Sequence, residues 1–323
     1  MNTLGKNFRL SIWGESHGTE VGCVIDGVPS GILLSEADFL PDIERRKAGA
    51  PGTTPRKEED RAEILSGVLD GYTTGAPIAI RFANKNISSD DYAKYKDIPR
   101  PGHADFTAGL RYEMYNDFRG GGHFSGRLTL PMVAGGVVAK KVLEAFKCSV
   151  KAEIVELGGI PRDKSAWEDA LKKAADKGDS LGAVVECSAT LPAGLGEPIW
   201  DGVESLIAHA VFAIPGVRGV EFGDGFRAAA MTGSNHNDPF GPDGLPAKNG
   251  SGGVNGGITN GAPLLFRVAF KPTSSIALPQ KTFNFSEGRM ETLRCTGRHD
   301  VCFALRTPPV VEAVTAMVIA DLL

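Results

Sequence analysis

The stretch Arg119-Gly120-Gly121-Gly122-His123-Phe124-Ser125-Gly126-Arg127 leads into the longest apolar segment of the chain, Leu128 to Ala139. The spacing of apolar residues there predicts a helix over about 127–146, too short in its apolar part to span a bilayer. Glycines before a helix N-terminus favour anion binding, because free N–H groups and the helix dipole point at the ligand. Ser125 and Arg127 add donors. A helix C-cap followed by an N-cap would give the same pattern.

Strand-like and helix-like segments are mixed on both sides of this predicted helix. They lack the regular strand–helix–strand alternation of a doubly wound sheet, so we expect an α+β fold with mostly antiparallel sheets. We find no Pro/Ser linker and no abrupt change in composition, and we expect one domain over 1–323. Strands are predicted at 8–13, 21–28, 63–69, 77–82, 150–157, 183–189 and 264–270, and helices at about 36–47, 107–118, 165–176, 202–213 and 308–322.

The composition restricts the classes of function. A net charge of −4 argues against a nucleic-acid-binding protein, which needs a basic face. The five cysteines form no CxxC motif, so we expect reduced thiols and neither a disulfide framework nor a zinc site. The N-terminal segment has no apolar core typical of a signal peptide, and we predict a cytoplasmic protein that does not bind membranes.

Glycine is unusually frequent, at 41 of 323 residues. The glycines cluster at 120–122 and 250–257 and lie singly at strand ends, where they permit positive φ angles and a close approach of backbone to ligand. Many tight turns in a β-rich protein would explain them equally well.

Missing motifs exclude several enzyme classes. The sequence contains no GxxxxGK[ST], HExxH or GxSxG, and its glycine runs are not placed as a GxGxxG between a strand and a helix. A P-loop nucleotidase, a zinc protease, an acyl hydrolase and a Rossmann dehydrogenase are therefore disfavoured.

Two histidine motifs follow apolar segments or polar loops. Gly14-Glu15-Ser16-His17-Gly18 places a histidine in a turn between two predicted strands, where an imidazole can exchange protons near neutral pH. Arg100-Pro101-Gly102-His103-Ala104-Asp105 combines a cation, an imidazole and a carboxylate in one short turn. A hydrogen-bonded turn histidine and a loop salt bridge are the alternatives without a function.

Three further motifs are rich in cations and hydroxyls. Lys271-Pro272-Thr273-Ser274-Ser275 follows the predicted strand 264–270 and suits a phosphate or a polar ring edge. Gly297-Arg298-His299-Asp300 precedes the last helix, and its aspartate is either a base or the partner of its arginine. Arg45-Arg46-Lys47 ends the first helix and could complement its dipole. Together the motifs indicate an enzyme for a small polyanionic, phosphate-bearing substrate.

These motifs, in this order and spacing, closely resemble the chorismate synthase family over nearly the whole chain. The chain departs from the family pattern at Phe124, at Leu128 in place of a glutamate, at Gly52 in place of an arginine and at Val301 in place of a proline. The resemblance implies a single-domain β-α-β sandwich. It extends to Asp26-Gly27-Val28-Pro29, Leu195-Gly196-Glu197-Pro198 and Gly219-Val220-Glu221-Phe222-Gly223-Asp224-Gly225-Phe226.

The resemblance implies a carbon–oxygen lyase that eliminates phosphate from 5-enolpyruvylshikimate 3-phosphate to give chorismate. This is the last shared step of the shikimate pathway toward the aromatic amino acids. It implies reduced FMN (FMNH2) as cofactor, without net redox change, and a homotetramer. Because no added segment is available to dock a nicotinamide, we expect an external flavin reductant. A flavin- or NADPH-dependent reductase and an inactive anion-binding relative are the alternatives.

The resemblance also implies roles for single residues. His17 would protonate the departing phosphate, His103 the reduced flavin, and Asp300 would help flavin N5 take the ring proton; an inactive binding relative has no need of all three. The arginines around the phosphate and carboxylates would be Arg46, Arg100 and Arg127. The implied flavin contacts are His123, Phe124, Ser125, Gly256, Lys271, Pro272, Thr273, Ser274, Ser275 and Arg298.

Overall fold

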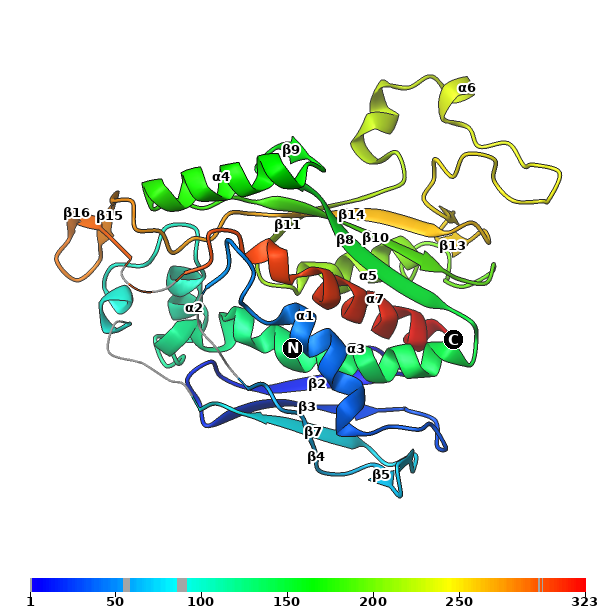
Figure 1. Ribbon diagram of the computed structural model, residues 1–323, viewed down its shortest axis with the longest axis horizontal. Helices are drawn as coiled ribbons and strands as arrows, with labels where there is room; N and C mark the ends of the chain where they lie inside the picture. Colours follow the sequence, from blue (N-terminus) through cyan, green and yellow to red (C-terminus); the bar gives the residue numbers. More distant parts are fainter. Residues whose placement is uncertain (1, 55–58, 86–91, 296, 298) are drawn as a thin grey trace.

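The computed structural model describes residues 2–54, 59–85, 92–295, 297 and 299–323. Within them the chain forms three layers, with helices between two five-stranded sheets (Figure 1). Every strand pair described is antiparallel. The predicted α+β class with antiparallel sheets is thus confirmed.

The first sheet has the strand order β1-β2-β3-β7-β4. Its central strand β3 places Cys23 opposite Ile12 of β2 and Ile80 of β7. Buried and more exposed residues alternate along β7, as expected for a sheet with one side on the core. The bounds are β1 (Thr3–Leu4), β2 (Arg9–Gly14), β3 (Glu20–Asp26), β4 (Glu63–Ile64) and β7 (Ile78–Ala83).

The second sheet has the order β11-β14-β10-β8-β9. Its middle strand β10 sets Val185 opposite Ile154 of β8 and Val268 of β14. Strand β11 was not predicted, because Gly219 and the charged residues beside it weaken the apolar alternation. The bounds are β8 (Ser149–Leu157), β9 (Ile160–Pro161), β10 (Ala183–Thr190), β11 (Val217–Phe222) and β14 (Leu264–Phe270).

Small hairpins complete the strands of the described chain. The predicted strand 63–69 is wrong as one element: it divides into β4 and β5 because Gly67 turns the chain with φ 81°. The polar hairpin β15–β16 was not predicted. The bounds are β5 (Val68–Leu69), β6 (Tyr72–Thr73), β12 (Val254–Asn255), β13 (Ile258–Thr259), β15 (Gln280–Asn284) and β16 (Arg289–Leu293).

Helices α1, α3, α5 and α7 lie between the sheets, and α4 covers the outer face of the second sheet (Figure 1). The predicted helix 107–118 is too long, because Glu113 and Met114 have positive φ angles of 52° and 64° that a right-handed helix excludes. The α-helices are α1 (Leu40–Arg46), α2 (Asp105–Arg111), α3 (Thr129–Glu144), α4 (Lys164–Lys177), α5 (Val203–Phe212), α6 (Gly233–His236) and α7 (Pro308–Leu322).

Short 3-10 turns lead into several of these helices. At the start of the first one, the backbone N–H of Ser35 donates to Oδ2 of Asp38 (2.8 Å), as its capping sequence indicates. The 3-10 segments are Glu36–Phe39, Ala93–Lys96, Arg119–Phe124, Gly126–Leu128, Gly225–Ala230 and Phe303–Arg306.

Helices α3 and α7 form the centre of the core. Both are buried on nearly all sides, which matches sequences that are apolar all round. A Cβ at Gly136 would lie 2.2 Å from Cβ of Ala313, so the two helices meet at a distance that only glycine allows. Both helices begin at the end of the molecule that carries α2 (Figure 1). None of the described helices has the length and apolar character needed to cross a membrane.

Candidate active site

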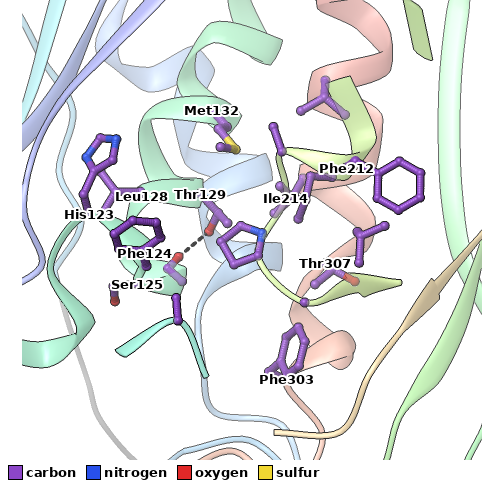
Figure 2. Close-up of a pocket in the computed structure, with 18 of the residues that line it drawn as sticks. His123, Phe124, Ser125, Leu128, Thr129, Met132, Phe212, Ile214, Phe303 and Thr307 are labelled. Carbon is purple, nitrogen blue, oxygen red and sulfur yellow. Dashed lines mark hydrogen bonds between the residues drawn. The ribbon is translucent and has the colours of Figure 1, made fainter. Parts of the chain in front are cut away.

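A cavity of about 860 Å³ lies where α3 and α7 begin, within the size range of small-molecule sites. Ser125 and Thr129 line one side, Phe212 and Ile214 face them, and Phe303 closes a third side (Figure 2). The cavity therefore collects segments that are far apart in the chain. Of the predicted site residues, it is lined by Arg46, Arg100, His103, His123, Phe124, Ser125, Lys271, Thr273, Ser274, Ser275 and Asp300.

His17 lies directly behind the cavity wall. Its side chain is buried, and its ring meets Tyr92 edge-on with centroids 5.2 Å apart. A Cβ at Gly120 would lie 2.3 Å from Cδ2 of His17, and Gly120 has φ 60°. Only glycine fits between the histidine and the cavity. Both Gly120 and Tyr92 line the cavity, so His17 packs against two residues of its wall.

Arg100, His103 and Asp105 form one buried unit. The guanidinium of Arg100 donates through Nε and Nη2 to both oxygens of Asp105 (2.7 and 2.8 Å). Nδ1 of His103 lies 2.6 Å from Oδ1 of Asp105 and 3.0 Å from Nη2 of Arg100. Both partners of the unit therefore contact the same ring nitrogen, Nδ1. The second ring nitrogen, Nε2, is on the side of Gly121.

The charges of this unit follow from burial and pairing. Burial lowers the pKa of His103 below its ordinary 6.5 and outweighs the opposing effect of Asp105, so the imidazole is neutral at pH 7. Burial opposes ionisation of Asp105, but hydrogen bonds from Arg100 and His103 outweigh it and hold the pKa of that carboxyl well below its usual range. His103 is therefore a neutral imidazole whose Nδ1 is engaged by Arg100 and Asp105.

Arg46 and Arg127 share a carboxylate that the sequence analysis missed. Nη1 of Arg46 lies 3.3 Å from Oδ2 of Asp60, and Nη1 of Arg127 contacts Oδ1 of the same residue. Burial opposes the charge of Asp60, but Arg46 and Arg127 outweigh it and lower the pKa of the carboxyl. Asp60 lies in a charged run typical of an exposed loop, so no signal in the sequence marked it. Arg46 lines the cavity, whereas Arg127 is not among the described lining residues.

Asp300 lines the cavity with an arginine partner that was not anticipated. Its Oδ1 accepts a hydrogen bond from the backbone N–H of Thr54 (2.7 Å) and lies 3.6 Å from Nη1 of Arg306. Arg298, the partner considered from the sequence, is outside the described residues. The carboxylate thus has one backbone donor and one distant cation among the residues described.

The turn 271–275 packs against the Arg100 unit. Nζ of Lys271 contacts the carbonyl of Gly102 and lies 2.8 Å from Oγ of Ser274, and Nη1 of Arg100 donates to Oγ of Ser275 (3.0 Å). Burial, with Arg218 and Arg100 nearby, lowers the pKa of Lys271.

The remaining predicted residues are placed as follows. His123 contacts the carbonyl of Gly14 through Nδ1 (3.3 Å). Pro272 and Gly256 are not among the lining residues in the part of the chain that the structure describes. Gly256 lies in the turn between β12 and β13, toward the end of the molecule opposite α2 (Figure 1). Two cations missed by the sequence analysis, Arg218 and Arg306, also line the cavity.

An α+β scaffold that gathers arginines, a lysine, a neutral histidine and a carboxylate around one cavity defines an enzyme for small anions. The family model for chorismate synthase matches residues 8–323. The chain belongs to the chorismate synthase family. The family and the lyase class predicted from the sequence are thereby confirmed.

Individual relatives agree along the full length of the chain. It is 56% identical over 323 residues to the chorismate synthase of Chitinophaga pinensis, covering 99% of this chain and 96% of the relative. It is 45% identical over 349 residues to that of Dehalococcoides mccartyi strain BAV1, with the same coverage of 99% and 96%. A crystal structure of chorismate synthase aligns with a TM-score of 0.76 at 28% identity, covering 98% of this chain and 92% of that one.

Proposed function

We propose that the cavity binds 5-enolpyruvylshikimate 3-phosphate and that the enzyme eliminates its phosphate to give chorismate. The observation that carries this proposal is the joint placement of Arg46, Arg100, Lys271, His103 and Asp300 on one cavity in a chain of this family. The substrate has a phosphate and two carboxylates. Each charge-assisted hydrogen bond contributes roughly 1.5–3 kcal/mol, so several cations are needed to hold such a polyanion in place of water.

The cavity also fits reduced FMN, which we propose as the cofactor. Oγ1 of Thr273 is buried without a hydrogen-bond partner among the described residues, which is expected of a group that awaits a ligand. Phe124, Ser125 and the turn 271–275 would hold it, opposite the apolar side chains of Phe212 and Ile214 (Figure 2). When bound, reduced FMN supplies the acceptor, N5, for the ring proton that the substrate loses. Contacts from Gly256 and Arg298 stay predictions.

The proton-handling residues divide the work by position. His17, behind Gly120, is proposed to deliver a proton to the departing phosphate. His103, whose Nε2 is on the side of Gly121, is proposed to protonate the reduced flavin.

Asp300 is proposed to assist removal of the ring proton. The backbone N–H of Thr54 fixes one of its oxygens, and Arg306 at 3.6 Å is too distant for a direct hydrogen bond. No described cation holds this carboxylate in a tight bidentate pair, which supports a role for its second oxygen at the cavity.

We further propose that the enzyme is a homotetramer and that an external donor reduces its flavin. Support for assembly comes from the segment 225–248, which projects from the body of the molecule (Figure 1). Phe226 and Phe240 on this segment are 85% and 72% exposed, which is unusual for large apolar side chains without a covering surface.

An anaerobic assay tests the proposed reaction. With photoreduced FMN and 5-enolpyruvylshikimate 3-phosphate, the purified protein should release phosphate and form chorismate over many turnovers. With oxidised FMN and no reductant it should be inactive. Folded, flavin-bound protein that shows no turnover would refute the reaction, and stoichiometric consumption of NADPH with this substrate would indicate the reductase alternative.

A further inference from the structure

Asp60 links two buried arginines, of which Arg46 lines the cavity. Its side chain is 2% exposed, and each of its oxygens contacts a different guanidinium, Oδ2 that of Arg46 and Oδ1 that of Arg127. The other donors of Arg46 are held by Thr129 Oγ1 (2.8 Å) and the carbonyl of Gly126 (3.1 Å). One carboxylate therefore sets the separation between two cations that would otherwise repel each other.

Asn84 continues this chain of contacts to the turn that carries His17. Its Oδ1 accepts a hydrogen bond from Nε of Arg127 (2.9 Å). Its Nδ2 faces three carbonyls of that turn, donating to Gly18 (2.9 Å) and more weakly to Glu15 (3.2 Å) and Ser16 (3.4 Å). A side-chain amide accepts from the guanidinium through its oxygen and donates to the turn through its NH2 group at the same time.

From these contacts we infer that Asp60 and Asn84 are positioning residues for the elimination reaction. Asp60 fixes Arg46 and Arg127 relative to each other, and Asn84 fixes the His17 turn to Arg127. The inference rests on the proposed function, because it concerns where the substrate's anions and the acid that protonates the departing phosphate are held. Neither residue is among the described residues that line the cavity, so both act through the groups that they hold.

Asp60→Asn gives a test in which a charge role and a positioning role predict opposite changes in substrate affinity. If Asp60 only reduced the positive charge of the site, Asp60→Asn would strengthen binding of the polyanionic substrate. If Asp60 positions the arginines, the same variant releases them to repel each other and weakens substrate binding. We expect about a tenfold loss of substrate affinity, with FMN affinity within about twofold of wild type, since tenfold corresponds to the loss of about one hydrogen bond.

The experiment uses the protein loaded with oxidised FMN. In this form we expect it to bind the substrate without turnover. Calorimetry gives the affinity for 5-enolpyruvylshikimate 3-phosphate, and quenching of flavin fluorescence gives the affinity for FMN. Glu59→Gln is the matched control, because Glu59 is the neighbouring acid and pairs with Lys85 at the surface with 72% of its side chain exposed. Glu59→Gln should bind both ligands as wild type does.

Asn84→Asp tests whether Asn84 positions the His17 turn. If Asp60→Asn does not fold, this variant alone tests the inference. The aspartate can still accept from Arg127 but cannot donate to the carbonyls of the His17 turn. We expect kcat with reduced FMN to fall about tenfold, while KM changes less than threefold.

The outcomes separate the inference from the proposed function. Unchanged or tighter substrate binding in Asp60→Asn, an equal loss of FMN affinity, or normal kcat in Asn84→Asp overturns the inference. A wild-type protein that binds no substrate overturns the proposed function and this inference with it.

Discussion

Two neighbouring arginines on α1, Arg45 and Arg46, belong to different charge clusters. Arg45 and Lys140 surround the buried Glu312 of α7, with hydrogen bonds of 2.7–2.8 Å, and Lys140 also pairs with Asp42 (2.6 Å). The backbone N–H of Ala152 adds a donor to Glu312 (2.9 Å). This Glu312 cluster joins α1, α3, α7 and β8, and its cations and carboxylates balance.

The second cluster, of Arg46 and Arg127 around Asp60, is different in charge and in place. Among the described residues it has two guanidiniums and one carboxylate, and Arg46 reaches the cavity. The comparison teaches that the Glu312 cluster joins elements of the core, whereas the Asp60 cluster reaches the cavity in which we propose that the anionic substrate binds. Variants in the site should therefore affect activity more than stability, and variants in the Glu312 cluster should do the opposite.

Asp300→Asn should give the largest effect on the site side of this comparison. Asparagine has nearly the same shape and can still accept from the N–H of Thr54, but it cannot act as a base. Turnover should fall about 10²–10⁴-fold, the usual range for a positioned acid–base group, while FMN and substrate still bind. Steady-state kinetics and ligand titrations measure both quantities.

The isotope effect adds a control to this prediction. Deuterium at the abstracted ring position should give a larger effect in Asp300→Asn as that step becomes limiting. Near-normal turnover, or loss of flavin binding with the chemical step unchanged, would mean that Asp300 is a structural partner of Arg306 and not a base. Asp300 would then contradict the expected difference between site and fold.

Glu312→Gln should give the largest effect on the fold side. It leaves Arg45 and Lys140 without their buried anion, which we expect to cost about 3 kcal/mol in free energy of unfolding, at the lower end for a broken buried pair because Arg45 is 44% exposed. Urea unfolding measures the change. The folded variant should keep its turnover per molecule.

A pair at the C-terminal end of α1 is the matched control. Glu44 pairs with Lys47 (2.5 Å) with 60% of its side chain exposed, so Glu44→Gln should change the free energy of unfolding by less than about 1 kcal/mol. Similar losses of free energy of unfolding in Glu44→Gln and Glu312→Gln would show that burial does not make the Glu312 cluster more stabilising than a surface pair.

The sequence predicts the layers better than it predicts such clusters. In long apolar segments such as 127–146 and 264–270 the periodicity of apolar residues predicts a helix or a strand, because this pattern is local in the sequence. Strand β11 and the hairpin β15–β16 are short and polar, so the pattern is too weak to predict them. The end of α2 depends on positive φ angles at Glu113 and Met114, for which the residue types give no warning.

The site shows the same limit. The cavity-lining groups in 100–105, 119–127 and 271–275 lie in short motifs, which is why they could be predicted. Asp60 and Asn84 act through contacts with Arg127, 67 and 43 residues away along the chain, and no local pattern encodes them. Periodicity also cannot pair Glu312 with Arg45, 267 residues away, although both lie in correctly predicted helices.

The smallest expected effect is in the pH dependence of stability. Burial opposes the charge of Glu312, but Arg45 and Lys140 outweigh it and lower the pKa of the carboxyl below its ordinary 4.5. A carboxyl with a lowered pKa in the folded state binds fewer protons folded than unfolded, so its contribution is complete above pH 4.5 and is lost as the pH falls toward the folded value. Wild type should therefore lose more free energy of unfolding between pH 6 and pH 3.5 than Glu312→Gln does, as urea titrations at each pH would show. Parallel curves for the two proteins would mean that the pKa of Glu312 is the same in the folded and unfolded states. The cluster would then contribute to stability through packing and not through charge.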